Sequence, residues 1–373
     1  MLLGKEYYIG MMSGTSIDGI DAVLVELDNK NITLMGQYSA AIPDTIRDAI
    51  LRLTQPGHDE INQLLELDAR LGELFANTVI QLCQQTRVAA REVKAIGHHG
   101  QTIRHRPTPP YANTLQIGDP NYIAEFTGIT TVADFRRRNI AQGGQGAPLL
   151  PAFHSHVFRD PQQMRAIVNI GGISNVTILI PGENTFGFDT GPGNMLMDLW
   201  CKKHKGTSYD NNGDFAASGN IYQPLLADLL AHPYFNMPPP KSTGRELFHE
   251  EWLNTYLENH PALPPADVQA TLTAFTTRSI QQAILKYAPQ ITEVYLCGGG
   301  AFNQHLVKEI RHLLEPRQVD STQALGIPPQ LVEAIAFAWF AKQTLHQQSV
   351  DLMDTTGSDR PTLLGGIYFA SGQ

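Results

Sequence analysis

Apolar residues form two similar patterns, one near the start of the chain and one near its middle. The stretches EYYIGMM and IDAVLVEL are apolar or alternating, and the glycine-bearing turn SGTSIDG joins them. NITLMGQYSA adds a third strand-like stretch. After residue 161 the pattern restarts, because AIVNIGGISNVTILI is again a strand, a tight Gly/Ser turn and a strand. Alternating or short apolar runs rich in β-branched residues are typical of strands.

Helical spacing appears in the longer segments that follow. In residues 60–86, Leu64, Leu67, Leu71 and Val79 fall on one helical face, and residues 265–287 predict a second long helix. Shorter helices are expected near Tyr122–Phe126, over MLMDLWCKKH, from Asn303 and at 329–345. Further strands are expected at KAIGHHG, TLQIGD, TTVADF, FGFD and EVYLCGGG. Residues 206–263, rich in Gly, Pro, Asn and Asp, predict an irregular insertion with short helices.

The restart predicts two α/β lobes, over residues 1–160 and 161–373, each with a mixed sheet and packed helices, and a cleft between them. The pattern leaves open whether the final helix, 329–345, packs back on the first lobe. It also leaves open a plainer interpretation, in which two unrelated hairpins share a common turn chemistry.

Composition narrows the class of protein. The 373 residues are 42% hydrophobic and 17% charged, which is typical of a globular protein, and the formal net charge is -9. That charge argues against a nucleic-acid or anionic-membrane surface. The cysteines Cys83, Cys201 and Cys297 are far apart, which favours buried thiols in a reducing compartment. No signal-like or membrane-spanning run is present in the sequence, so we expect a cytoplasmic protein.

Three glycine-bearing segments are candidates for binding phosphate or a nucleotide. The first is the turn Gly14-Thr15-Ser16-Ile17-Asp18-Gly19-Ile20-Asp21, in which Asp18 is a candidate magnesium ligand. The second is Gly171-Gly172-Ile173-Ser174-Asn175, and the third is Gly298-Gly299-Gly300 before a predicted helix. Neither a P-loop nor a strand-linked dinucleotide motif is present. The alternatives are an ordinary hairpin turn and a flexible glycine connection.

The loop Phe188-Asp189-Thr190-Gly191-Pro192-Gly193-Asn194 offers a candidate general base. Asp189 follows a predicted strand, where loops carry function on a rigid scaffold, and an ionised carboxylate can accept a proton at neutral pH. The alternative is that Asp189 caps the helix that begins near Gly193.

Other polar residues are candidates for substrate contacts. The run Arg136-Arg137-Arg138 enters a glycine-rich loop, so one arginine is a candidate for an anionic group, although a solvated face is equally consistent with the pattern. His98 and His99 favour polar contacts or loop packing over a metal site, since no tetrahedral ligand set accompanies them. Glu333, on an apolar helix, either reaches a cleft or lies on the surface of the first helical turn.

Taken together, these segments resemble the anhydro-N-acetylmuramic acid kinase family. The resemblance rests on MSGTSIDGID, GHHGQTIRH, ADFRRRN, GGQGAPL, NIGGISN, FDTGPGN, YLCGGGAFN and IPPQLVEAIAFAW, which occur in the family's order from about residue 8 to residue 340. Each block alone is a weak signal, but the series in order is specific.

The resemblance implies a fold of two RNase H-like, actin-like lobes around an ATP cleft. It implies that Gly14–Asp21 and Gly171–Asn175 bind the phosphates of ATP, that Gly298–Gly300 lies near the adenosine, and that Asp189 is the base. We expect Gln101, Arg138 and Glu333 to bind substrate and Mg²⁺ to accompany ATP. Family enzymes open the 1,6-anhydro ring of anhydro-N-acetylmuramic acid and phosphorylate the freed O6, during peptidoglycan recycling.

One residue departs from the family pattern, which places an aspartate where this chain has Asn139. An asparagine keeps the shape and the hydrogen bonds but loses a charge, so substrate affinity is put in question. Two other interpretations of the sequence remain: another sugar kinase or polyphosphate-acting enzyme of the superfamily, and a non-catalytic nucleotide switch. The resemblance also implies a homodimer, with residues 206–263 as a candidate interface.

Overall fold

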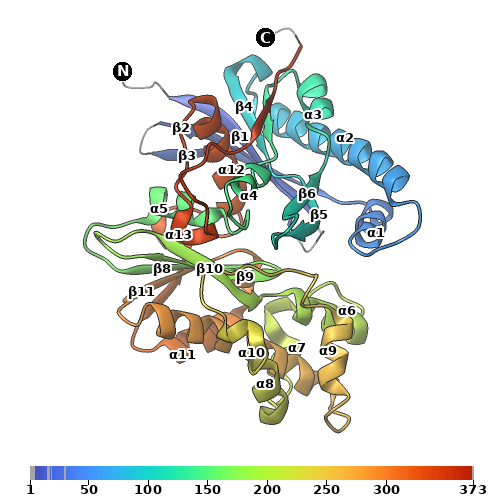
Figure 1. Ribbon diagram of the computed structural model, residues 1–373, viewed down its shortest axis with the longest axis vertical. Coiled ribbons are helices and arrows are strands. Elements are labelled where there is room, and N and C mark those ends of the chain that lie inside the picture. The colour runs from blue at the N-terminus through green and yellow to red at the C-terminus, as the bar shows by residue number, and fades with distance from the viewer. Residues whose placement is uncertain (1–4, 15–16, 18, 29–30, 372–373) are drawn as a thin grey trace. The chain divides into compact units, whose positions relative to one another are not determined.

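The computed structural model describes residues 5–14, 17, 19–28 and 31–371 (Figure 1). The chain divides into two compact units. The first consists of residues 1–157, 333–353 and 357–373, and the second of residues 158–332 and 354–356. The second unit is therefore inserted, in sequence, between the two large parts of the first.

The first unit is built on a mixed sheet that grows from the first hairpin. Its strands are β1 (Glu6–Met12), β2 (Gly19–Leu27), β3 (Ile32–Ala41), β4 (Val93–His98), β7 (Thr131–Ala133) and β13 (Gly366–Tyr368). Their order is β13-β7-β4-β1-β2-β3. The three strands β1, β2 and β3 are antiparallel, whereas β4 and β7 run parallel to β1. A separate ribbon pairs β5 (Gln101–Arg106) with β6 (Asn113–Ile117).

Helices cover both faces of this sheet. The first unit contains α1 (Asp44–Leu53), α2 (Glu60–Thr86), the 3-10 helix η1 (Ala90–Glu92), α3 (Pro120–Thr127), α4 (Arg137–Ala141), α5 (Leu150–Phe158) and α12 (Val332–Leu345). The residues of the short helix α13 (Met353–Thr356) are divided between the two units. Figure 1 shows α2 running along the sheet of the first unit.

The alternation of side chains along β1 explains how α2 and α12 are placed. The side chains of Ile9 and Met11 share a buried core with residues of α2. Because successive positions of a strand face opposite sides, the position of Gly10 faces the other side of the sheet. There a methyl group on Gly10 would overlap the carbonyl oxygen of Ala334 in α12. Gly97 in β4 repeats the arrangement against the carbonyl oxygen of Phe337. Because these glycines have no side chains, α12 lies directly on the backbone of the two central strands.

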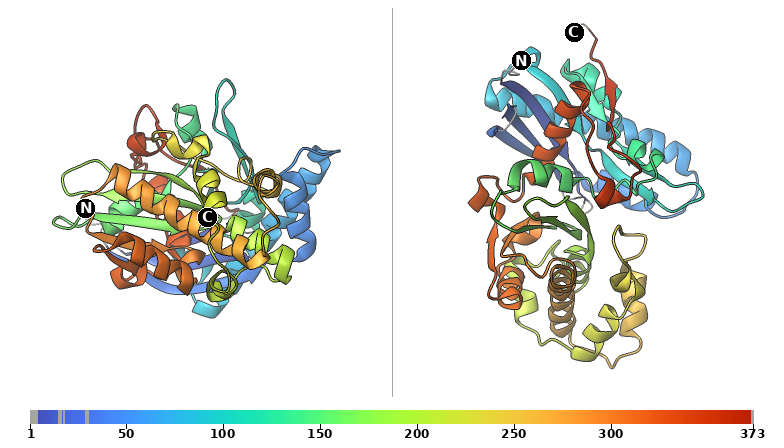
Figure 2. Two further views of the ribbon diagram at one scale, coloured as in Figure 1. Left: turned by 90° about the horizontal axis from the view of Figure 1, so that it is seen from below. Right: turned by 60° about the vertical axis from the view of Figure 1, so that its left-hand side comes forward.

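The second unit has a five-stranded mixed sheet, seen from two further directions in Figure 2. Its strands are β8 (Arg165–Ile170), β9 (Ile173–Leu179), β10 (Phe186–Pro192), β11 (Glu293–Cys297) and β12 (Gln318–Ser321), in the order β10-β9-β8-β11-β12. The strands β8, β9 and β10 are antiparallel, whereas β11 and β12 run parallel to β8.

One face of this sheet packs on a large apolar core. The helices of the second unit are α6 (Met195–Lys205), α7 (Asp214–Ala217), α8 (Gln223–Leu230), α9 (Glu250–Leu257), α10 (Pro265–Tyr287) and α11 (Gln304–Leu314), with 3-10 helices η2 (Asn211–Gly213), η3 (Pro233–Asn236), η4 (Gly299–Phe302) and η5 (Thr322–Leu325). Val168, Val176 and Phe188 of the sheet share this core with Leu272 and Phe275 of the long helix α10.

Apart from β13 at the edge of the first sheet, the two sheets have the same strand order and the same directions. In each, three antiparallel strands are followed by two parallel strands on the side of the first strand, which is the RNase H-like topology of actin-like proteins. The predicted α/β class with two mixed sheets is therefore confirmed. In the described part of the chain, no helix has the length and apolar character that crossing a membrane requires. The expected cleft between two lobes concerns how the units are arranged and stays a prediction.

Several elements were not predicted from the sequence. The helix α1, the strands β5, β12 and β13, and the short helices α4 and α13 were missed, whereas the long helices at 60–86 and 265–287 have the predicted bounds. The strand β13 pairs with β7, which returns the C-terminal segment to the first unit.

We predict that Gly10→Ala will destabilise the first unit by about 2–4 kcal/mol, because the added methyl group forces α12 away from β1. Urea unfolding followed by circular dichroism measures the change. The matched control is Gly57→Ala, since Gly57 is exposed and no atom lies near its added methyl group. Equal unfolding free energies for wild type and Gly10→Ala would contradict direct packing of α12 on the strand.

Candidate active site

The first hairpin turn is braced by a buried glutamine. Ser13 Oγ donates to Gln101 Oε1 at 2.7 Å and contacts the Gly19 carbonyl oxygen at 3.2 Å. Gln101 Nε2 in turn donates to the Gly14 carbonyl oxygen at 3.4 Å. Ile17 has a φ of 58°, in the left-handed region that a β-branched residue rarely adopts. The turn is therefore locally strained, which is common where a loop must present its backbone to a ligand.

The first predicted phosphate loop is described only in part. Thr15, Ser16 and Asp18 lie outside the described residues, whereas Gly14, Ile17, Gly19, Ile20 and Asp21 lie within them. Asp21 pairs with Met12 at the turn end of the hairpin, and its Oδ1 accepts a hydrogen bond from Ser39 Oγ at 2.6 Å. Gln101, the predicted substrate ligand, is buried behind the turn, and a direct contact with substrate stays a prediction.

The second hairpin turn is fixed by the start of α6. The backbone amides of Gly193 and Met195 donate to the carbonyl oxygen of Gly172 at 2.9 and 3.2 Å, and that of Asn194 donates to Gly171 at 2.8 Å. A methyl group on Gly193 would overlap the carbonyl oxygen of Gly171. The predicted hairpin and the predicted aspartate loop thus meet through main-chain hydrogen bonds that require a glycine at 193.

The third glycine segment lies beside the second hairpin. Gly298 has a φ of 78°, and its amide donates to the Pro329 carbonyl oxygen at 2.9 Å. A methyl group on Gly300 would overlap the side chain of Ile170, the last residue of β8. The glycine at 299 is exposed, and a methyl group added to it would lie 3.7 Å from its nearest neighbour, Asn194 Nδ2. The structure therefore brings Gly171–Asn175 and Gly298–Gly300 together within the second unit.

A polar row crosses the sheet on the face opposite the apolar core. Asp189 on β10 pairs with Asn175 on β9, and Asn175 pairs with Asn169 on β8. All three are buried, and Asn175 Oδ1 has no hydrogen-bond partner among the described residues. Buried polar atoms are normally satisfied, so an unpaired acceptor in this row indicates a place where a ligand or water supplies the hydrogen bond.

Asp189 is held by a segment of the predicted irregular insertion. Its Oδ2 accepts from the Thr243 amide at 3.0 Å, and its own amide donates to the Lys241 carbonyl oxygen at 3.2 Å. The Tyr234 hydroxyl donates to the Asp189 carbonyl oxygen at 2.7 Å. The backbone amide and carbonyl of Asp189 are therefore both fixed, and its carboxylate is held by the Thr243 amide. Asp189 does not cap the following helix, because the residue at that position is Asn194.

This bracing segment, Lys241-Ser242-Thr243, was missed because its neighbourhood is rich in proline and lacks periodicity. The signal was present in PPPKSTGRE, where small hydroxyl residues and a glycine lie among three charged side chains. Such a run in an otherwise loose insertion is typical of a loop with a defined function.

The three arginines after β7 have different partners. Arg136 donates to His99 Nε2 at 2.9–3.0 Å and to the Gly146 carbonyl oxygen at 2.8 Å. Arg137 forms an ion pair with Asp134 at 2.7 Å. Arg138, the predicted substrate ligand, is exposed and donates from one nitrogen to the Leu363 carbonyl oxygen at 3.1 Å. Of the three, Arg138 has the fewest contacts that a substrate would have to displace.

Asn139 supports the glycine-rich loop that follows these arginines. Its Oδ1 accepts from the Gly146 amide at 2.8 Å, and its Nδ2 has no partner among the described residues. The bond from Gly146 needs only an oxygen acceptor, so an aspartate and an asparagine would serve equally in this contact. The departure from the family pattern therefore leaves this loop contact intact.

Burial favours the neutral form of His98 and His99 in the first unit. Burial lowers the pKa of His98 to about 4, and burial together with Arg136 lowers the pKa of His99 well below its usual value. His98 Nε2 lies 2.8 Å from the Gly118 carbonyl oxygen, so it packs the loop after β6. No group of three or more metal-ligating side chains occurs in the described ranges. Glu333 is half-buried in the first turn of α12.

The predicted site residues therefore form two groups, one in each unit. In the first unit, Gln101 contacts the described residues of the first turn. In the second, Asp189, Ser174 and Asn175 lie on neighbouring strands beside both glycine segments. The turn of each unit follows the first strand of its sheet, so the two turns have equivalent places in the repeated topology.

Two sheets of this topology, each with a glycine-bearing turn after its first strand, define the actin-like class of nucleotide-binding proteins. Comparison with known families is more specific, since residues 6–370 match the family "Anhydro-N-acetylmuramic acid kinase". The chain belongs to the anhydro-N-acetylmuramic acid kinase family.

Relatives with this name cover nearly the whole chain. The kinase of Shewanella oneidensis is 50% identical over 370 residues, which are 99% of this chain and 100% of the relative. The kinase of Chromobacterium violaceum is 48% identical over 365 residues, which are 97% of this chain and 99% of the relative. The predicted family and its kinase activity are therefore confirmed.

Solved structures give more distant likenesses. An activator of 2-hydroxyisocaproyl-CoA dehydratase from Clostridium difficile, with bound ADPNP, matches with a TM-score of 0.45 and 13% identity, over 91% of this chain and 97% of that chain. A ROK family glucokinase from Streptomyces griseus, in complex with glucose and AMPPNP, matches with a TM-score of 0.39 and 12% identity, over 90% of this chain and 99% of that chain.

We predict different effects for alanine at the neighbouring glycines 299 and 300. Gly300→Ala will lower the free energy of unfolding by about 1–3 kcal/mol, because its methyl group overlaps Ile170. Gly299→Ala has room within the protein, so its stability will stay near that of wild type, while its affinity for a non-hydrolysable ATP analogue will fall about tenfold. Thermal unfolding and isothermal titration calorimetry measure the two effects. Wild-type nucleotide affinity in Gly299→Ala would contradict the expectation that Gly298–Gly300 lies near the adenosine.

Proposed function

We propose that this kinase hydrolytically opens 1,6-anhydro-N-acetylmuramic acid and transfers the γ-phosphoryl group of ATP to O6, giving N-acetylmuramic acid 6-phosphate and ADP. Membership of the family supports the substrate and the donor. The observation that carries the mechanism is the fixed carboxylate of Asp189, in a polar row that is continuous with the second glycine hairpin.

Asp189 is the proposed general base. A base must lie within hydrogen-bond reach of the proton it removes, and a carboxylate that is fixed in place needs little reorganisation when the reaction begins. In the proposed step, Asp189 takes a proton from a water that attacks the anomeric carbon. The bond from that carbon to O6 breaks, and O6 attacks the γ-phosphorus as the bond to ADP breaks. One base thus serves both the hydrolysis and the phosphoryl transfer.

The glycine segments are the proposed phosphate and adenosine sites. Residues Gly14–Asp21 and Gly171–Asn175 bind the phosphates through backbone amides, and Gly298–Gly300 contacts the adenosine. Main-chain contacts between Gly171–Gly172 and residues 193–195 support this proposal, since they hold the second turn rigid. Preorganised amides stabilise charge that develops on the transferred group without reorganising during the reaction.

We infer that Mg²⁺ accompanies ATP. Magnesium in such sites is held by one or two carboxylates, with phosphate oxygens and waters as its other ligands, so a dense acidic cluster is not required. Asp21, at the turn end of the first hairpin, fits this demand, and Asp18 is the ligand expected from the sequence. When bound, the ion neutralises negative charge on the phosphates.

The muramic lactyl carboxylate is the proposed partner of Arg138. A guanidinium group matches a carboxylate in shape and charge, and Arg138 keeps donors that the Leu363 contact does not use. Glu333, in the first turn of α12, and Gln101, behind the first turn, complete the proposed substrate residues. We also propose that the enzyme acts in the cytoplasm, where ATP is available, and that it forms a homodimer.

We predict that Asp189→Asn will lower sugar-dependent ADP release by a factor of about 10²–10⁴, the range expected for losing a general base. The amide keeps an oxygen for the Thr243 contact, so the affinity for a non-hydrolysable ATP analogue will stay within about twofold of wild type. A coupled assay with Mg-ATP and the anhydro sugar measures turnover. The control is Asp214→Asn, an exposed carboxylate on α7. Substantial turnover in Asp189→Asn would assign the base elsewhere.

We predict that Arg138→Met will raise the KM for the anhydro sugar by about tenfold or more, with little effect on the KM for ATP, because a charge-assisted contact is lost. Arg137→Met is the matched control, since Arg137 is also exposed but is paired with Asp134. Steady-state kinetics with each substrate varied in turn separate the two constants. An unchanged sugar KM in Arg138→Met would remove this arginine from the substrate site.

A further inference from the structure

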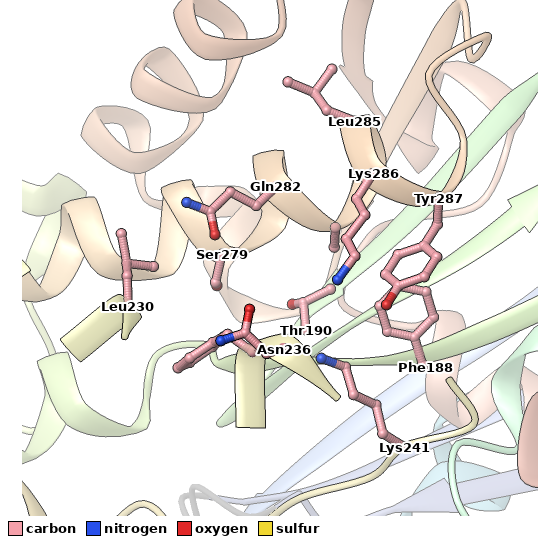
Figure 3. Close-up of a pocket in the computed structure, with 12 residues that line it drawn as sticks. Phe188, Thr190, Leu230, Asn236, Lys241, Ser279, Gln282, Leu285, Lys286 and Tyr287 are labelled. Atoms are coloured by element: carbon pink, nitrogen blue, oxygen red, sulfur yellow. The ribbon is translucent and has the colours of Figure 1, made fainter. Parts of the chain in front are cut away.

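A cavity of about 430 Å³ lies in the second unit, beside the strand that carries Asp189 (Figure 3). It is lined by Phe188, Thr190, Leu230, Phe235, Asn236, Lys241, Ser279, Gln282, Ala283, Leu285, Lys286 and Tyr287. Side chains alternate along a strand, so the lining residues Phe188 and Thr190 point away from the face that carries Asp189. The cavity is therefore separate from the polar row, and neither the proposed reaction nor the proposed ATP site uses it.

One wall of the cavity is aromatic and aliphatic. Phe188 and Tyr287 meet edge to face, with ring centroids 5.0 Å apart. Phe235, from η3, and Leu230, from α8, extend this apolar wall. Apolar walls with a few convergent polar groups are typical of sites for small molecules.

A buried ammonium group faces the cavity. Lys241 is only 4% exposed, and its Nζ donates to the Tyr234 carbonyl oxygen at 3.0 Å. The same nitrogen lies 4.5 Å from the centre of the Tyr234 ring. An ammonium group has three donors, and within the described ranges this is the single hydrogen bond of the Lys241 nitrogen. Buried charges are normally paired, so the remaining donors indicate an acceptor that the protein does not supply.

A second ammonium group lies across the same cavity. Figure 3 shows the amine nitrogens of Lys241 and Lys286 turned toward one part of the cavity, near Thr190 and Asn236. Burial and the charge of Lys286 lower the pKa of Lys241 to about 8, against the opposing effect of Asp189. None of the lining residues carries a carboxylate. Two cations that converge without a lining anion favour a ligand that brings negative charge.

We propose that this cavity binds a small phosphate monoester, with its phosphate between Lys241 and Lys286 and its carbon skeleton against Phe188, Phe235 and Tyr287. A phosphate monoester carries a charge between about -1.5 and -2 near pH 7, which matches two ammonium groups better than a single carboxylate does. Lysine binds phosphate as a point charge, so no planar geometry is required of the two side chains. Sugar phosphates have this combination of a compact dianion and a ring with an apolar face.

In the experiment, the full-length protein is titrated with N-acetylglucosamine 6-phosphate, and isothermal titration calorimetry measures the binding. Saturating ADP and Mg²⁺ are present so that the proposed phosphate turns are occupied. We expect the phosphorylated sugar to bind, and N-acetylglucosamine itself to bind at least tenfold more weakly. Lys286→Met will weaken binding of the phosphorylated sugar by about tenfold, whereas Lys308→Met, an exposed lysine on α11, will leave it unchanged.

The pH dependence gives an independent test. The charges of Lys286 on α10 and Asp189 on β10 act on the Lys241 amine, and its nitrogen lies over the ring of Tyr234 on η3. Since a bound dianion favours the protonated amine, affinity will be highest between about pH 6, above which the phosphate is a dianion, and pH 8, and it will fall as the pH rises through about 8. Lys241→Met will bind weakly and lose this pH dependence. If that variant does not fold, Lys286→Met and the wild-type pH series still decide the proposal.

Two results would overturn it. One is binding of the phosphorylated sugar no tighter than that of the neutral sugar, and the other is equal affinity in wild type and Lys286→Met. Equal affinity for inorganic phosphate would contradict the part assigned to the aromatic wall. Binding is measured directly, so these outcomes do not depend on Asp189 or on turnover. The test of this cavity is therefore independent of the test of the proposed function.

Discussion

The second unit depends on three main-chain hydrogen bonds that join the start of α6 to the turn between β8 and β9. The amides of residues 193–195 donate to Gly171 and Gly172, and this approach is possible only because Gly193 has no side chain. The bonds fix the turn, the last residues of β10 and the beginning of α6 together. The register between β9 and β10 then places Asp189 beside Asn175, and Thr243 completes the position of the carboxylate. The chemistry proposed for Asp189 follows from this backbone arrangement.

The turn of the first unit is also held in place, but by different residues. It is held from behind by the side chain of Gln101, which bonds to Ser13 and Gly14, and not by the start of a helix. The two sheets therefore share one topology while their turns are supported by a side chain in one case and by main-chain amides in the other. This difference explains why the turns look alike in sequence but their supporting residues do not.

Much of the fold could be predicted because its signals are local. The helices at 60–86 and 265–287 have long, regular patterns, and the two hairpins repeat one plan. The missed elements are short or depend on distant partners: β13 has three residues and exists because it pairs with β7. Asp189 was found from its glycine-rich surroundings, whereas Lys241 and Thr243 were missed because their contacts with it span more than fifty positions of an aperiodic segment. The role of Gln101 as a brace was likewise hidden, since no sequence pattern distinguishes a buried glutamine from a ligand-binding one.

The return of the chain to the first unit has a consequence for biosynthesis. The helix α12, which lies on the glycines of β1 and β4, and the strand β13 are translated after the whole of residues 158–332. Because chains emerge from the ribosome N-terminus first, the second unit can fold as soon as it is made. Residues 1–157 are made earlier, but one face of their sheet stays uncovered until α12 has been translated. The part of the protein that is translated first is therefore the last to be completed, and during that interval it exposes the apolar surface that chaperones recognise.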